Sequence, residues 1–84
     1  MASRDGEIAI TMPNMDLTIA EATVVRWLKR VGDTVHAGEP IVEVETDKAV
    51  LEVESTATGT VVQLLVQEGV AIPLGQPLAM VRPT

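Results

Sequence analysis

The 84-residue chain is short enough for a single small domain, contains no cysteine, and carries a formal net charge of −6 from 12 acidic and 6 basic residues. The absence of thiols excludes disulfides, and with a single histidine it also excludes the usual Cys/His zinc sites. The acidic balance argues against nucleic acid and anionic membranes as partners, and no apolar run approaches the length of a membrane span.

The composition favours β-strands, because valine and isoleucine together number 18 and threonine adds 9. The segment 24–30 is compatible with one or two helical turns, but its counterpart 61–67 in the repeat described below is rich in strand formers, which favours strand for both. Eight short strands predict an all-β fold, a flattened β-barrel or sandwich. In chain order, apolar segments bounded by Gly and Pro predict strands near residues 7–12, 22–28, 34–36, 40–46, 49–55, 59–66, 70–72 and 77–82.

The chain repeats itself at a spacing of 37 residues. Placing Ala20–Val44 on Ala57–Val81 gives nine identical pairs among 25. Both copies contain the pattern G-x5-G-x-P, in which glycine suits turns with positive φ and proline suits the entry to a strand. The repeat predicts a duplicated unit of about four strands and argues against an SH3-like barrel, which has a similar composition.

The stretch EVETDKAVLEV, Glu43 to Val53, predicts a β-hairpin with Lys48 at its tip. With Asp47 and Lys48 as the two central turn residues, alternation sorts the flanking side chains onto two faces, and a one-residue shift would mix them. Asp-Lys is not a pair that favours the tight primed turns, so we expect a type I turn. One face then carries Val42, Val44, Leu51 and Val53, and the other carries Glu43, Glu45, Glu52 and Val50.

A lysine at such a tip is accessible and sits on a stiff support. The neighbouring Asp47 and Glu45 favour its charged form, which counts against a role as nucleophile or Schiff-base former. The position instead suits covalent attachment by a partner enzyme, and the simplest alternative is an ordinary solvated lysine. A shift by 37 residues takes Lys48 to position 11 or 85, so in a twofold-related barrel we expect the tip to lie opposite the chain ends.

The motif Glu45-Thr46-Asp47-Lys48-Ala49 resembles the lipoyl-lysine motif of lipoyl domains, which belong to the dihydrolipoyl acyltransferase (E2) component of 2-oxo acid dehydrogenase complexes. The resemblance extends from about Ile8 to Val81 and implies the family fold, a flattened β-barrel of two four-stranded antiparallel sheets with quasi-twofold symmetry. Further matches are Met12-Pro13, Trp27-Leu28-Lys29, Gly32-Asp33-x-Val35, Gly38-Glu39-Pro40, Gly59-x-Val61, Glu68-Gly69 and Gly75-Gln76-Pro77-Leu78-Ala79.

The resemblance implies a carrier without catalytic residues of its own. Lipoic acid would be joined by an amide to Lys48 and would shuttle acyl groups and reducing equivalents. The implied partners are an E1 thiamine-diphosphate decarboxylase, the E2 acyltransferase core, an E3 dihydrolipoyl dehydrogenase, and a lipoate ligase or lipoyl/octanoyl transferase. We expect a monomeric isolated domain in the bacterial cytoplasm or, for a eukaryotic source, the mitochondrial matrix.

Several further residues receive roles by the same resemblance. The lysine is flanked by a predicted recognition segment for the modifying enzyme: Glu45, Thr46, Asp47, Ala49 and Val50. For Asp47 and Ala49 the alternative is a plain turn former and filler. A loop beside the lysine turn is expected to help E1 recognise the domain, and its sequence departs from commoner family members: Asn14, Met15, Asp16, Leu17 and Thr18.

The sequence allows two interpretations of the acidic residues in the hairpin strands. They form either a docking face for partners or an ordinary solvated strand face: Glu43, Glu45, Glu52 and Glu54. Trp27 is expected to pack against the core, and His36 receives no catalytic or metal role.

Three alternatives remain at the level of the sequence. A biotin carrier shares the fold but typically has Met on both sides of its lysine, where this chain has Asp47 and Ala49. The glycine-cleavage H protein carries lipoate but is longer, and unmodified lipoyl-like interaction modules lack the tip motif. The predicted boundaries are an N-terminal tail at 1–6, the domain at 7–82 and the start of a linker at 83–84, as expected for a fragment of a larger E2. The sequence does not fix the 2-oxo acid.

Overall fold

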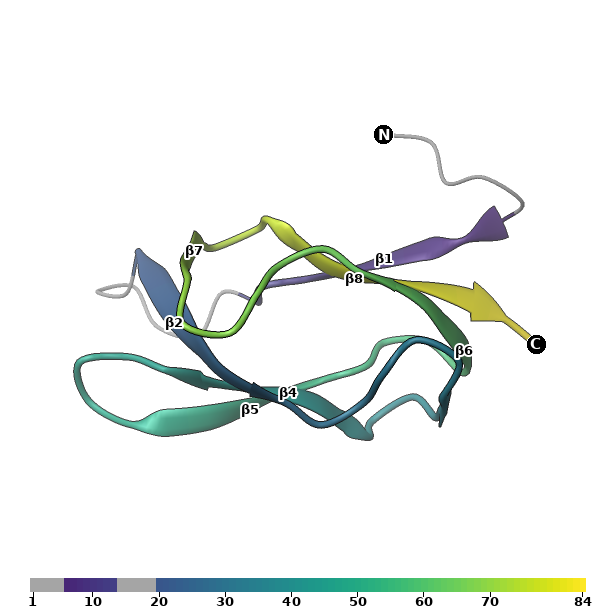
Figure 1. Ribbon diagram of the computed structural model, residues 1–84, viewed down its shortest axis with the longest axis horizontal. Helices are drawn as coiled ribbons and strands as arrows, with labels where there is room; N and C mark the ends of the chain where they lie inside the picture. Colours follow the sequence, from purple (N-terminus) through teal and green to yellow (C-terminus); the bar gives the residue numbers. More distant parts are fainter. Residues whose placement is uncertain (1–5, 14–19) are drawn as a thin grey trace.

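The computed structural model describes residues 6–13 and 20–84, and these form eight strands (Figure 1). Each strand lies within two residues of its predicted bounds. The described residues contain no α-helix, so the helical alternative for 24–30 is wrong, and no helix there could cross a membrane. The strands are β1 (Ile8–Thr11), β2 (Glu21–Trp27), β3 (Thr34–Val35), β4 (Pro40–Glu45), β5 (Val50–Glu54), β6 (Gly59–Leu64), β7 (Ala71–Pro73) and β8 (Pro77–Pro83).

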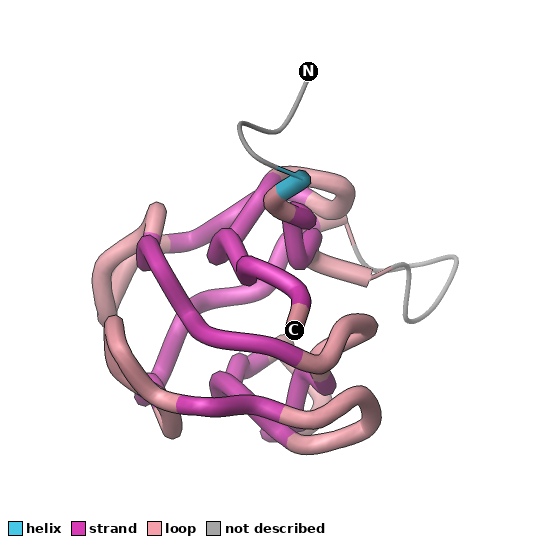
Figure 2. Tube along the Cα trace, turned by 90° about the vertical axis from the view of Figure 1, so that its right-hand side faces the viewer, coloured by secondary structure: helices cyan, strands magenta, loops and turns pink. Residues whose placement is uncertain are grey.

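The strands form two four-stranded sheets. Sheet A has the order β1-β8-β6-β3, sheet B has the order β5-β4-β2-β7, and every pairing is antiparallel. Viewed from the end at which the C-terminus lies, the strands enclose the core as a flattened ring (Figure 2). The predicted flattened barrel or sandwich of two four-stranded antiparallel sheets is therefore confirmed.

The 37-residue repeat in the sequence corresponds to a quasi-twofold symmetry that relates the two sheets. A shift by 37 converts β2, β3 and β4 into β6, β7 and β8, and the order of sheet B then becomes the order of sheet A, with β1 in the place of β5. The registers correspond as well, because Val24 pairs with Val44 as Val61 pairs with Val81. The register shifts by one residue directly after Val24 and again directly after Val61. The two copies therefore share strand order, register and β-bulges.

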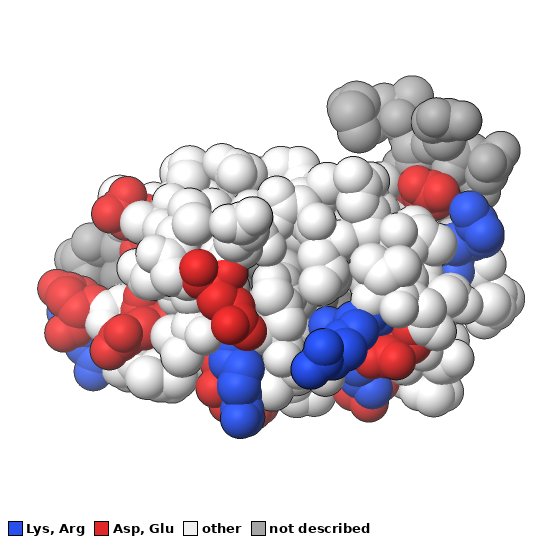
Figure 3. All heavy atoms as spheres, viewed as in Figure 1, with Lys and Arg blue, Asp and Glu red and all other residues white. Residues whose placement is uncertain are grey.

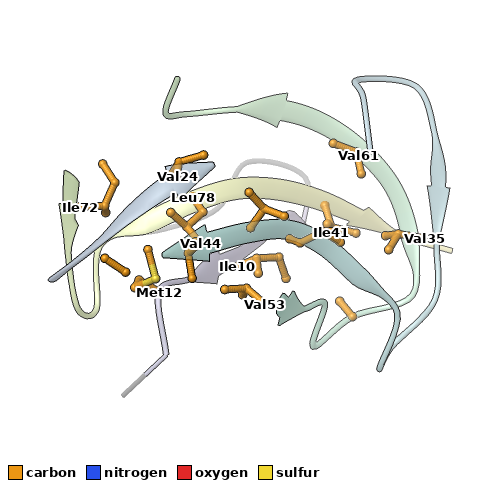
Figure 4. Packing of buried hydrophobic residues seen from close by; sticks show 14 residues of the cluster. Ile10, Met12, Val24, Val35, Ile41, Val44, Val53, Val61, Ile72 and Leu78 are labelled. Carbon is orange, nitrogen blue, oxygen red and sulfur yellow. The ribbon is translucent and has the colours of Figure 1, made fainter. Parts of the chain in front are cut away.

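The core lies between the two sheets and is almost purely aliphatic, with contributions from both (Figure 4). Its β-branched side chains alternate with outward-facing residues, which is the pattern expected of half-buried strands. The largest side chains with less than 2 % exposure are Ile10, Met12, Val24, Val35, Ile41, Val42, Val44, Val61, Leu78 and Val81. This packing is what holds the body rigid beneath the hairpin.

Two details differ from the sequence-based expectation. Leu51 pairs with Val44 as predicted, but it is 36 % exposed, because it lies on the edge strand β5 close to the hairpin tip. Pro83 pairs with Gly59 inside β8, so the strand runs one residue past its predicted end at 82. Proline is tolerated there because it stands at the end of the strand.

Trp27 has the predicted packing role. Its ring is half-buried against the core. The indole Nε1–H donates to the carbonyl of Val66 at 3.0 Å, and its backbone N–H donates to the Glu68 carboxylate at 2.9 Å. These bonds join β2 to the loop after β6, which lies far away in the sequence.

The turn between β3 and β4 is held by the carboxylate of Glu39. One oxygen accepts a hydrogen bond from the backbone N–H of His36 at 3.0 Å, and the other lies 2.8 Å from the ammonium of Lys29. The Lys29 hydrogen bond, followed by that of His36, holds the pKa of the Glu39 carboxyl below its ordinary value of 4.5, against a smaller opposing effect of desolvation. The ionised carboxylate thus stabilises the turn.

This lowered pKa predicts a pH-dependent contribution to stability. Since the folded pKa lies below the unfolded one, the stabilisation is present above pH 4.5 and is lost as the pH falls through the folded pKa. Urea unfolding of wild type and Glu39→Gln, followed by Trp27 fluorescence, should show a modest wild-type advantage at neutral pH that disappears once the pH has fallen below the folded pKa. An advantage that grows on acidification would contradict this assignment.

Candidate functional site

The hairpin β4–β5 carries Lys48 at its tip. The register pairs Val42 with Val53, Glu43 with Glu52, Val44 with Leu51 and Glu45 with Val50, as the alternation predicted. The Thr46 N–H donates to the Ala49 carbonyl at 2.9 Å and closes the turn over Asp47 and Lys48. The two-residue turn inferred from the sequence is therefore the turn that forms.

Thr46 braces this turn with its side chain. Its hydroxyl oxygen accepts hydrogen bonds from the backbone N–H groups of Lys48 and Ala49, both at 3.2 Å, and the hydroxyl lies 3.3 Å from the Ala49 carbonyl, to which it donates. This bracing role differs from the predicted one, which was recognition by the modifying enzyme. The available signal was the preference of Ser and Thr hydroxyls for bonding backbone groups two and three residues further on.

Lys48 is exposed at the extreme end of the hairpin, and the C-terminus lies at the opposite end of the molecule (Figure 1). The described beginning of the domain is at the C-terminal end too, because Ile8 pairs with Val81. The tip is thus presented away from the chain ends, as the repeat predicted. A primary amine in this position can form an amide with an activated carboxylic acid, so the residue fits a covalently attached acyl cofactor.

The outer face of sheet B is acidic. Glu43, Glu45, Glu52 and Glu54 alternate with the buried valines of β4 and β5, and Arg26 on β2 lies 3.4 Å from Glu43. This ion pair is exposed to solvent and contributes little to stability. In the view of Figure 3, acidic side chains gather at the end where the hairpin lies, while the upper part of the molecule, over β7 and β8, is largely uncharged.

The quasi-twofold shows that this acidity belongs to one half of the molecule. Glu43 and Arg26 of sheet B correspond to Met80 and Gln63 of sheet A, which are paired in the same register. The segment 55–81 contains only one charged residue, Glu68. The two copies therefore keep the same backbone, but the acidic outer surface of β4 has no acidic counterpart on β8.

An open hollow of about 410 Å³ lies beside the lysine turn. It runs between the start of β2 and the end of β4, and three carboxylates belong to its lining. Such a lining suits a polar or cationic group better than an apolar one. The lining residues are Ala20, Glu21, Ala22, Thr23, Glu45, Thr46 and Asp47.

The structure brings the predicted flank together around Lys48, since Glu45, Asp47, Ala49 and Val50 are all exposed on the hairpin. Their recognition role stays a prediction. The predicted partner loop, Asn14, Met15, Asp16, Leu17 and Thr18, lies outside the described residues. Within residues 6–13 and 20–84, no group of three or more His, Asp or Glu side chains could hold a metal ion.

The chain is similar to known proteins in sequence and in structure. A family model described as "Biotin-requiring enzyme", covering biotinyl and lipoyl domains, matches residues 8–81. The dihydrolipoyllysine-residue acetyltransferase component of the pyruvate dehydrogenase complex of Mycobacterium tuberculosis is 40 % identical over 72 residues, which are 86 % of this chain and 13 % of that protein. The dihydrolipoyllysine-residue succinyltransferase component of the 2-oxoglutarate dehydrogenase complex of Staphylococcus saprophyticus is 44 % identical over 72 residues, or 86 % of this chain and 17 % of that protein.

The similarity extends to solved structures. The lipoyl domain of the 2-oxoglutarate dehydrogenase complex of Azotobacter vinelandii is 35 % identical and superimposes with a TM-score of 0.70. The match covers 92 % of this chain and 99 % of that domain. The chain therefore spans less than a fifth of the two enzyme components but almost the whole of the solved domain.

Proposed function

Because this chain belongs to the biotinyl/lipoyl domain family, we propose that it is a lipoyl carrier domain with lipoic acid joined by an amide to Lys48. The observation that carries the proposal is the exposed Lys48 at the tip of a closed two-residue turn, within the motif Glu45-Thr46-Asp47-Lys48-Ala49. Lipoate is favoured over biotin by the flanking Asp47 and Ala49 and by the similarity to a solved lipoyl domain over 99 % of its length.

When attached, the cofactor supplies a disulfide that can be reduced and acylated, so the chemistry of transfer belongs to it and to the partner enzymes. The domain presents the Lys48 side chain on a rigid body, away from the chain ends. Attachment to a larger assembly through those ends would raise the effective concentration of the tip at each partner site. The acidic outer face of sheet B offers a charged surface next to the tip.

We place the domain in a 2-oxo acid dehydrogenase complex, because its relatives are components of the pyruvate and 2-oxoglutarate complexes. The corresponding partners are the E1 decarboxylase, the E2 acyltransferase core, the E3 dihydrolipoyl dehydrogenase, and a lipoate ligase or lipoyl/octanoyl transferase. Relatives of both kinds match this chain at comparable identity, so the proposal concerns the class of complex and not one 2-oxo acid.

The proposal is tested by offering the purified domain both cofactors. One sample receives lipoate, ATP and a lipoate ligase, and a parallel sample receives biotin, ATP and a biotin ligase. Intact mass and peptide mapping should show one lipoyl group on Lys48 and no biotin. A biotin adduct without a lipoyl adduct would make the chain a biotin carrier, and no adduct in either sample would make it an unmodified interaction module.

A further inference from the structure

We propose that Thr46 is a positioning residue for the modification of Lys48, because its hydroxyl fixes the backbone from which the modifying enzyme takes the lysine. The inference rests on the proposed carrier function, and it assigns Thr46 a different role from its exposed neighbours. Asp47, Lys48 and Ala49 are exposed at the tip, whereas Thr46 is partly buried beneath them.

A further constraint matters for this turn because the conformational preferences of its two central residues do not favour it. Asp47 and Lys48 are neither of them glycine, and an Asp-Lys pair is not among the dipeptides that favour a two-residue hairpin loop. One backbone hydrogen bond, from Thr46 N–H to Ala49 C=O at 2.9 Å, spans the turn. With that bond alone, the tip of an edge hairpin is expected to fray and to occupy several conformations.

The Thr46 hydroxyl provides the missing constraint. It accepts from the N–H groups of Lys48 and Ala49 at 3.2 Å each, so it holds the backbone of the modified residue and of the residue after it. Donation to the Ala49 carbonyl at 3.3 Å uses its own proton. Since the hydroxyl makes three contacts within the turn, and a β-branched side chain has few χ1 states, Thr46 acts through the backbone and not as a contact for the enzyme.

The expected consequence is a change in apparent affinity. If the modifying enzyme recognises only one conformation of the turn, its apparent affinity for the domain falls in proportion to the fraction of molecules in that conformation. The hydroxyl therefore raises the apparent affinity of the modifying enzyme for the domain without touching the enzyme. The effect should appear in KM and in kcat/KM, with kcat at saturating domain concentration much less affected.

The test compares wild type, Thr46→Val, Thr46→Ser and Thr58→Val as substrates of a lipoate ligase supplied with lipoate and ATP. Valine keeps the shape of threonine without its hydroxyl, and serine keeps the hydroxyl. Thr58→Val is the matched control, because the Thr58 hydroxyl also accepts a backbone hydrogen bond, from Ala37 N–H at 2.9 Å, outside the lysine turn. Loss of the Thr46 hydrogen bonds should lower kcat/KM roughly tenfold through a higher KM, with Thr46→Ser and Thr58→Val within about threefold of wild type.

Steady-state {1H}-15N NOE values for Lys48 and Ala49 give a second readout that does not depend on the enzyme. They should fall in Thr46→Val and stay near wild type in the other two variants. Wild-type kinetics in Thr46→Val, or equal losses in Thr46→Val and Thr46→Ser, would overturn the positioning role. If wild type itself gains no lipoyl group, the carrier function fails, while the NOE comparison still decides whether the hydroxyl orders the turn.

Discussion

Replacing Lys48 with arginine is expected to abolish lipoylation of the domain completely. Arginine keeps the positive charge and much of the length of the side chain, but its delocalised guanidinium does not form the amide that a primary amine forms. Intact mass after incubation with lipoate, ATP and a lipoate ligase should show a full shift for wild type and none for Lys48→Arg. Reductive acylation by the proposed E1 partner should fall to background in the same variant.

The chain offers a matched control, because Lys29 is its only other lysine. The ammonium of Lys29 lies 2.8 Å from Glu39, and its side chain is 22 % exposed, so it is held against the body and not at a tip. Lys29→Arg should accept one lipoyl group as wild type does. A lipoyl adduct on Lys48→Arg, or loss of the adduct in Lys29→Arg, would contradict the assignment of Lys48 as the attachment site.

Replacing Leu78 with alanine is expected to cause a large loss of stability. Leu78 is fully buried on β8, the strand that β1 and β6 flank in sheet A (Figure 4). Truncating a buried leucine costs about 2–5 kcal/mol, a large share of the about 5–15 kcal/mol by which a small domain is stable. Urea unfolding followed by Trp27 fluorescence should therefore show a strongly lowered midpoint, with part of the protein unfolded even without urea at the upper end of this range.

Leu65→Ala is the control for this measurement. It removes the same atoms from a side chain that is 40 % exposed, in the loop after β6. The expected cost is about 1 kcal/mol, because little apolar surface is returned to water. Equal losses in the two variants would mean that the interior of sheet A tolerates the cavity, and the aliphatic core would then not be the main source of stability.

The strands and their pairing were predictable because two independent signals agree. The alternation of valine and glutamate in Glu43–Val53 allows only one register, and the 37-residue repeat extends the strand pattern to the rest of the chain. The position of Lys48 at the tip followed from the same alternation. The strands, the register of the hairpin and the position of Lys48 were therefore predictable from two-residue alternation and the internal repeat.

Other features depend on distances that no periodicity encodes. The three hydrogen bonds of the Thr46 hydroxyl exist only once the turn has a definite backbone geometry. The exposure of Leu51 depends on its place on an edge strand near the tip, although its face was predicted correctly. The shared bulges after Val24 and Val61 are set by the pairing of each strand with its neighbour, which a single strand's sequence does not encode. Local alternation predicts the face of the strand on which a side chain lies, whereas its solvent exposure depends on the tertiary structure around it.

The interleaving of the two halves has a consequence for folding. The strands β1 and β3 of the first half pair with β8 and β6 of the second, so neither half contains a complete sheet. Ile8 meets its partner Val81 only after nearly the whole chain is available, which gives the topology a high contact order and predicts slow, all-or-none folding. The lysine hairpin is local in sequence, but the core beneath its valines is complete only when β8 contributes Leu78 and Val81. The hairpin would thus reach its final stability together with the whole body.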